Sequence, residues 1–161
     1  MEILWGQAIA AGLVATGLMT LAMIAGRVMG LETNMVRVLG LAFTSEQHRT
    51  QMYIIGTVAH FGFGAVFGII YALLLTAIGA APILGAAAAY GAMIGGVHGL
   101  FVGAGLGALP AVHPRMGSGQ VLSAPGFFGR DIGVGFPVAV ILLHIVYGVT
   151  AGVVYSVGVI S

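Results

Sequence analysis

Three histidines inside apolar stretches are the residues of this sequence best placed to do chemistry. His60 and His144 begin the segments HFGFGAVFGIIY and HIVYGVTAGVVY, and His98 lies in a stretch rich in glycine and alanine. A neutral imidazole can hydrogen-bond a neighbouring membrane helix, or it can be the axial ligand of a haem or a chlorophyll. Because an ionisable group is costly to bury in a membrane, each of the three is a functional candidate.

The segments at 60–71 and 144–155 share one pattern, His-x-x-[Phe/Tyr]-Gly-x-x-x-Gly-x-x-Tyr, at an offset of 84 residues. The same offset places Ala8 on Ala92 and Gly12 on Gly96. The pattern predicts an internal repeat, approximately 1–80 and 81–161, whose equivalent helices run in the same direction.

The composition indicates an integral membrane protein. Of the 161 residues, 60% are hydrophobic and only 6% are charged, against about 25% charged in soluble domains. Apolar stretches at about 3–27, 51–79, 83–109 and 132–160 are each long enough for a spanning helix. The fold class that follows is all-α membrane: four transmembrane helices in a single domain, 1–161, built as two parallel-repeat helical hairpins (helices 1–2 and 3–4).

Glycines recur every four residues and predict the faces on which the helices pack. Small residues let membrane helices approach closely, where the hydrophobic effect gives little drive for association. Both repeat histidines lie on these strips and should face the bundle interior, whereas His98 lies off the strip of its own helix. The predicted helix-packing residues are Gly56, Gly64, Gly68, Gly91, Gly95, Gly99, Gly103, Gly107, Gly148 and Gly152.

All the cationic side chains are arginines, and all five lie at or in the segments 27–50 and 110–131. The positive-inside rule therefore predicts a multi-pass membrane protein with loops 28–50 and 110–131 in the cytoplasm and both termini outside. Trp5, Tyr71 and Tyr155 fall near the outer ends of their spans, which is typical of the aromatic belt at a membrane interface.

Polar residues suggest where the helices begin. Thr44 and Gln47 fit a capping box ahead of the second span, and Asp131 is placed to cap the last span. Pro137 should kink that last helix or mark its first turns. Apolar residues at helical spacing between 35 and 43 fit either a short interfacial helix or a tethered loop.

Several classes of function are disfavoured by what the sequence lacks. It has no cysteine and no basic patch, so thiol chemistry, iron–sulfur clusters and nucleic-acid binding are not expected. None of its four acidic residues lies well inside a span, which argues against an ion-coupled transporter. Neither a catalytic triad nor a phosphate-binding loop is present in the required context, so we expect no enzyme. We assign no metal site, and a three-histidine site is the weaker alternative because His98 lies off the glycine strip of its helix.

Four features together resemble small uncharacterised prokaryotic four-span membrane proteins. They are the stretch AGLVATGLMTLAM, the His-aromatic-Gly second helix, a loop with PGFF, and the closing HIVYGVTAGVVY. The resemblance covers most of the chain and implies a four-helix architecture in a prokaryotic cytoplasmic (inner) membrane, with no activity and no functional residues assigned.

Two functional hypotheses remain. The first is a small structural or accessory subunit whose glycine-rich faces pack against other membrane subunits or further copies of itself, surrounded by membrane lipids. The alternative is a haem b- or chlorophyll-binding protein, for electron transfer or pigment organisation, with His60 and His144 as candidate axial ligands and His98 as a weaker one. The sequence allows such a cofactor without requiring one.

Overall fold

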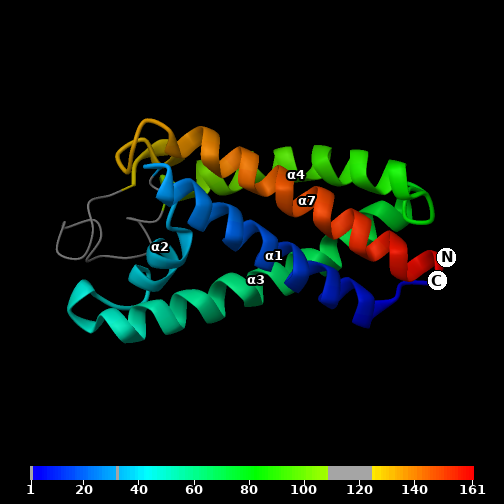
Figure 1. Ribbon diagram of the computed structural model, residues 1–161, viewed down its shortest axis with the longest axis horizontal. Helices are drawn as coiled ribbons and strands as arrows, with labels where there is room; N and C mark the ends of the chain where they lie inside the picture. The colour runs from blue at the N-terminus through cyan, green and yellow to red at the C-terminus, as the bar shows by residue number, and fades with distance from the viewer. Residues whose placement is uncertain (1, 32, 109–124) are drawn as a thin grey trace.

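A computed structural model describes residues 2–31, 33–108 and 125–161 (Figure 1). These residues are helical and contain no strand, and their four long helices are each long and apolar enough to cross a membrane. The predicted all-α, four-span fold is therefore confirmed. The α-helices are α1 (Trp5–Val28), α2 (Met35–Leu41), α3 (Arg49–Ala77), α4 (Leu84–Leu106) and α7 (Phe136–Ile160), with short 3₁₀ turns η1 (Glu46–His48) and η2 (Phe127–Gly129).

The four long helices are arranged in the order α3, α1, α7, α4, with each packed on the next. By contrast, α3 and α4 barely touch, although a short turn joins them directly. Figure 1 shows that these two helices meet at the turn and diverge toward the opposite end of the molecule. The bundle is consequently closed on the α1–α7 side and open between α3 and α4.

Both chain ends lie at the same end of the bundle as the turn between α3 and α4 (Figure 1). There the Gln7 side chain donates a hydrogen bond of 2.8 Å to the carbonyl of Val154, which ties α1 to α7. The loop containing α2 lies at the opposite end, as does the described part of the 110–131 loop, residues 125–131. Residues 110–124 of that loop fall outside the described part of the chain.

Glycines bring the helix backbones of each hairpin into direct contact. In the first hairpin, a Cβ on Gly12 would collide with the carbonyl oxygen of Gly64. In the second, a Cβ on Gly91 would collide with the carbonyl oxygen of Gly148. Because a backbone atom cannot move aside as a side chain can, these positions accept only glycine without a shift of the helices.

These contacts also define the repeat in space. Gly64 and Gly148 are equivalent, as the sequence offset of 84 predicts. Gly12, however, is equivalent to Gly91, at an offset of 79, whereas the predicted equivalent, Gly96, has only a side-chain atom of Ile145 near its Cβ position. The matching contact of Gly68 with Ala8 and of Gly152 with Ala87 gives the same offset.

The segment before α3 forms the short helix α2, which settles the choice between helix and loop. The side chain of Asn34 caps it by accepting a hydrogen bond of 3.0 Å from the backbone N–H of Arg37. The helix then packs on the first turns of α3, where Cβ atoms on Gly40 and Gly56 would collide with the carbonyls of Met52 and Val36.

Two predicted helix starts are wrong. A 3₁₀ turn precedes α3, which begins at Arg49, and the Thr44 hydroxyl donates to the carbonyl of Gly40 instead of forming a capping box. Asp131 does not cap α7, which begins at Phe136 with Pro137 in its first turn. Proline suits that position because the first N–H groups of a helix have no intrahelical partner.

Candidate ligand site

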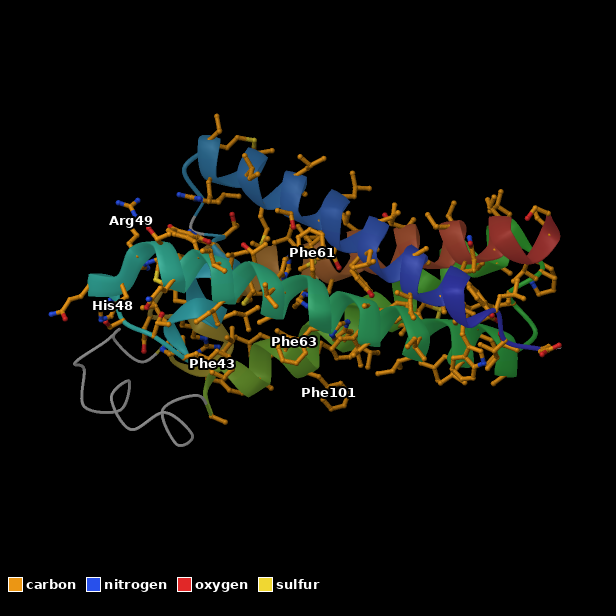
Figure 2. All side chains as sticks on the ribbon, turned by 90° about the horizontal axis from the view of Figure 1, so that it is seen from below. Phe43, His48, Arg49, Phe61, Phe63 and Phe101 are labelled. Carbon is orange, nitrogen blue, oxygen red and sulfur yellow. The ribbon has the colours of Figure 1, made fainter. Side chains whose placement is uncertain are left out.

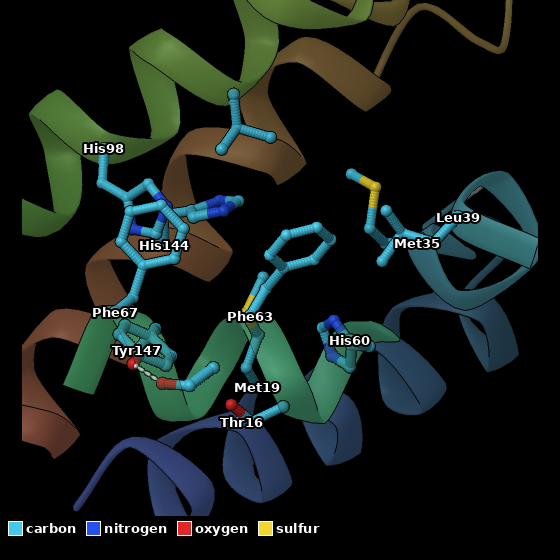
Figure 3. A pocket seen from close by; sticks show the side chains of 12 residues that line it. Thr16, Met19, Met35, Leu39, His60, Phe63, Phe67, His98, His144 and Tyr147 are labelled. Carbon is cyan, nitrogen blue, oxygen red and sulfur yellow. Dashed lines mark hydrogen bonds between the residues drawn. The ribbon is translucent and has the colours of Figure 1, made fainter. Parts of the chain in front are cut away.

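A cavity of about 260 Å³ lies among the helices, on the open side where α3 and α4 diverge (Figure 3). Each of the five α-helices contributes two or more residues to its wall. The lining is apolar and aromatic apart from a few polar groups, chief among them the three intramembrane histidines. The lining residues are Thr16, Met19, Met35, Leu39, His60, Phe63, Gly64, Phe67, His98, Val102, His144 and Tyr147.

His60 is only 7% exposed, so the prediction that it faces the interior is correct. Its Nε2 lies 3.2 Å from the hydroxyl oxygen of Thr20 on α1. Thr20 donates its single hydroxyl proton to the carbonyl of Thr16, at 2.7 Å, so it can only accept from the imidazole. The proton of neutral His60 is therefore on Nε2, and Nδ1 carries a lone pair.

His144, 6% exposed, has the opposite arrangement. Its Nδ1 lies 2.7 Å from the carbonyl oxygen of Val140, one turn earlier on the same helix. A carbonyl only accepts, so Nδ1 carries the proton and the lone pair is on Nε2.

Both lone pairs can be reached from the cavity. Within the described part of the chain, Ser156 Oγ is the only fully buried side-chain polar atom without a hydrogen-bond partner. His60 Nδ1 and His144 Nε2 also have no partner among the described residues, so they must be accessible. Since both rings line the cavity and are otherwise buried, the cavity is where they are accessible.

The ring that contacts His144 belongs to His98, which was the weaker candidate ligand in the prediction from sequence. The His98 and His144 ring centroids are 4.6 Å apart in an edge-to-face arrangement, and Phe67 packs on His98 at 3.8 Å. The Tyr71 hydroxyl lies 3.4 Å from His98 Nδ1. Figure 3 shows His60 apart from this pair, with the ring of Phe63 between them.

A tyrosine hydrogen bond joins the two hairpins beside the cavity. The Tyr147 hydroxyl on α7 donates to the carbonyl of Gly64 on α3 at 2.6 Å (Figure 3). Sequence reasoning did not select Tyr147, although the repeat pattern held a signal. Phe63 and Tyr147 occupy the same position, three residues after the histidine, and both line the cavity.

The aromatic-belt prediction is wrong for two of its three residues. Tyr71 and Tyr155 are each 1% exposed, inside the bundle. Tyr71 packs edge-to-face on Tyr147, and the Tyr155 hydroxyl lies 3.5 Å from that of Thr76. They are buried because α3 and α7 cross α1 near these positions, with Tyr155 packed among the buried alanines of that end. Trp5, by contrast, is 56% exposed and stays a predicted interface anchor.

The predicted packing glycines are used by the chain's own helices. All of them except Gly107 are buried, and Gly107 lies just beyond the end of α4 beside Phe127. Gly103 is covered by the ring of Phe128, whose φ of 59° lies in the left-handed region. Other glycines, such as Gly17, Gly62 and Gly85, have nothing within 4 Å of their Cβ positions and lie on the outer faces of α1, α3 and α4.

Two exposed aromatic side chains are labelled in Figure 2: Phe63 lies in the space between α3 and α4, and Phe101 lies on the outer side of α4. Among the described residues, no group of three or more His, Asp or Glu side chains is gathered to hold a metal ion. What the arrangement offers chemically is two imidazole lone pairs and several aromatic faces in an apolar recess. Comparison of this chain with protein-family models, curated proteins and solved structures gives no match.

Proposed function

We propose that this small integral membrane protein binds a lipid-soluble ligand in the three-histidine cavity. The observation that carries the proposal is the pair of accessible lone pairs, His60 Nδ1 and His144 Nε2, on a cavity enclosed by apolar helices. Convergent polar groups in an otherwise apolar recess are the usual mark of a small-molecule site. The proposal is for a binding protein without catalysis of its own.

A haem or chlorophyll is one class of ligand that these residues suit. A metal-binding histidine commonly donates its other ring N–H to a carbonyl, as His144 does to Val140. His144 would hold the metal on one face, and the metal would supply electron transfer or light absorption. Ligation by His60 and His144 together would require Phe63 to move, because its ring lies between them.

The test is an absorption spectrum of protein purified in mild detergent, with mass spectrometry of an organic extract. We expect a molecule to co-purify with the wild-type protein. The amount bound per protein should fall about tenfold in His144→Phe, since one strong polar contact is worth about 1.4 kcal/mol. His48→Phe is the matched control, because His48 is exposed and lies outside the long helices. Extracts that hold only bulk lipid in all three proteins would refute the proposal.

A structural or accessory role is a second candidate, favoured by the outer face of α4. That helix packs closely only on α7 and exposes Met93, Val97 and Phe101. A partner helix of a second subunit, or of a further copy, would cover this face. Blue-native electrophoresis should then show a particle larger than the monomer that Phe101→Ala reduces in size. A strictly monomeric wild-type particle would argue against it.

The predicted location and orientation also belong to this proposal: a prokaryotic inner membrane, as the resemblance implies, with the α2 end of the bundle in the cytoplasm, as the arginines predict. The absence of cysteine makes the orientation simple to measure. Phe43 and Ile160 are both exposed and lie at opposite ends of the bundle, so each can be replaced by a single cysteine. An impermeant maleimide added outside the cell should label the cysteine at position 160 and leave the cysteine at position 43 unlabelled. The reverse labelling would invert the topology.

A further inference from the structure

Resting on the proposed binding function, we infer that the cavity takes a quinol-type headgroup: a single aromatic ring carrying hydroxyl groups, with an apolar tail in the bilayer. The contacts that point to this class are the direction of the hydrogen bonds, the size of the cavity, its aromatic walls and its position on the open side of the bundle.

The hydrogen-bond direction requires a ligand that donates. His60 and His144 both place their own N–H on protein oxygens, which leaves acceptors toward the cavity. A hydroxyl proton satisfies such a lone pair, whereas the carbonyl oxygen of a quinone or an ester adds a second acceptor and gains nothing there. The reduced, hydroxylated form of the ring is therefore the one that fits the acceptor of either imidazole.

The size of the cavity favours a single ring over a macrocycle. Its volume of about 260 Å³ lies just under the ~300–1,000 Å³ of sites for drug-sized ligands. Phe63 divides the space between His60 and the His98–His144 pair, so a flat four-pyrrole ring meets an obstacle that one six-membered ring does not.

The walls supply stacking partners. Phe67 already packs on His98, and Phe63 presents a second ring from the same helix. Aromatic rings bound between such faces gain up to about tenfold in affinity beyond the area they bury. The ring therefore has both a stacking surface and hydrogen-bond acceptors within one recess.

The open side of the bundle accommodates the tail. Because α3 and α4 barely touch, the cavity lies at the gap between them and not behind a closed interface. Phe63, which lines the cavity at this gap, is apolar and more than half exposed. An isoprenoid or alkyl tail can leave between the two helices and remain among lipid chains.

The experiment compares a ligand that can donate hydrogen bonds with its O-methylated form, which cannot. Decylubiquinol, kept reduced, and its hydroquinone dimethyl ether are titrated into purified protein by isothermal titration calorimetry in one detergent. We expect decylubiquinol to bind at least tenfold more tightly than the ether, and His144→Phe to reduce that ratio toward one. His48→Phe should keep the wild-type ratio. The ligand pair tests the inference on wild-type protein even if the variant fails to fold.

The outcomes separate the two proposals. Equal binding of quinol and ether would overturn the inference, because it would show simple partitioning of an apolar molecule. If haemin binds with a Soret shift that His144→Phe abolishes while the quinol does not bind, the quinol inference fails and the binding function stands. If neither haemin nor quinol binds and no ligand co-purifies, both proposals fail.

Discussion

The two hairpins carry the same histidine at the same place, yet the histidine forms different bonds in each. In the α1–α3 hairpin, His60 donates across the interface to Thr20. In the α4–α7 hairpin, His144 donates to its own helix at Val140. The residue equivalent to Thr20, at the packing offset of 79, is Gly99, and a Cβ at Gly99 would lie 3.2 Å from the Cβ of His144.

This one difference explains the two bonding patterns. Glycine has no hydroxyl to accept the imidazole proton, so His144 turns to a carbonyl one turn away. Glycine also lets α4 and α7 stay in contact over a longer stretch than α1 and α3 do. Both hairpins thus rely on backbone contact at their glycines, and only the first adds an interhelical histidine bond.

The largest expected effects come from the glycines that both hairpins share. Gly91→Ala and Gly12→Ala should each destabilise the fold by about 1–3 kcal/mol, because each new Cβ meets a backbone carbonyl that cannot rotate away. Gly85→Ala and Gly17→Ala are the controls in the same two helices, since nothing lies within 4 Å of their Cβ positions. Unfolding in a graded denaturing detergent measures all four.

Equal losses at Gly91 and Gly12 would support the offset of 79 between α1 and α4. If Gly96→Ala proved as costly as Gly91→Ala, the offset of 84 predicted from sequence would describe the first and third helices better. Alanine has the higher helix propensity, so the control variants should be neutral or slightly stabilised. Controls as costly as the interface variants would therefore contradict close packing as the cause of the loss.

An intermediate effect is expected where the hairpins join. Tyr147→Phe removes the hydroxyl that donates to Gly64 and should cost about 1 kcal/mol, in the range of interhelical hydrogen bonds in membranes. Tyr90→Phe, at a residue 44% exposed on α4, should change stability little. A wild-type unfolding curve for Tyr147→Phe would show that the α7–α3 bond contributes nothing measurable.

The smallest energetic effect, about 0.6 kcal/mol, should follow Thr20→Val, because its bond to His60 is long and lies at the cavity edge. A more sensitive comparison of the two hairpins is ¹⁵N NMR of the imidazoles at neutral pH, which shows which ring nitrogen carries the proton. His60 should be protonated at Nε2 and His144 at Nδ1, and only His60 should respond to Thr20→Val. Thr57→Val, on an exposed face of α3, is the control. Identical tautomers at both sites would remove the contrast between the hairpins.

Most of the correct predictions about the helix interior came from the four-residue spacing of small residues. It placed His60 and His144 in the interior and identified the glycines that touch, because a helix face repeats close to every four residues and small residues mark close contacts. It could not give the register of one helix against its neighbour, either within a hairpin or between hairpins. That is why the pairing of His98 with His144, the Thr20 acceptor and the burial of Tyr71 were missed.

The unequal lengths of α3 and α4 have a consequence for the surrounding bilayer. With 29 and 23 residues, they extend about 44 and 35 Å, against a hydrocarbon thickness of ~30 Å. Helix α2 packs on the extra turns of α3. The α2–α3 flank is therefore the longer one, and tilting of α3 is one way in which a bilayer accommodates such a length. We therefore predict that membrane thickness affects the angle between α3 and α4, and with it the width of the gap at the cavity.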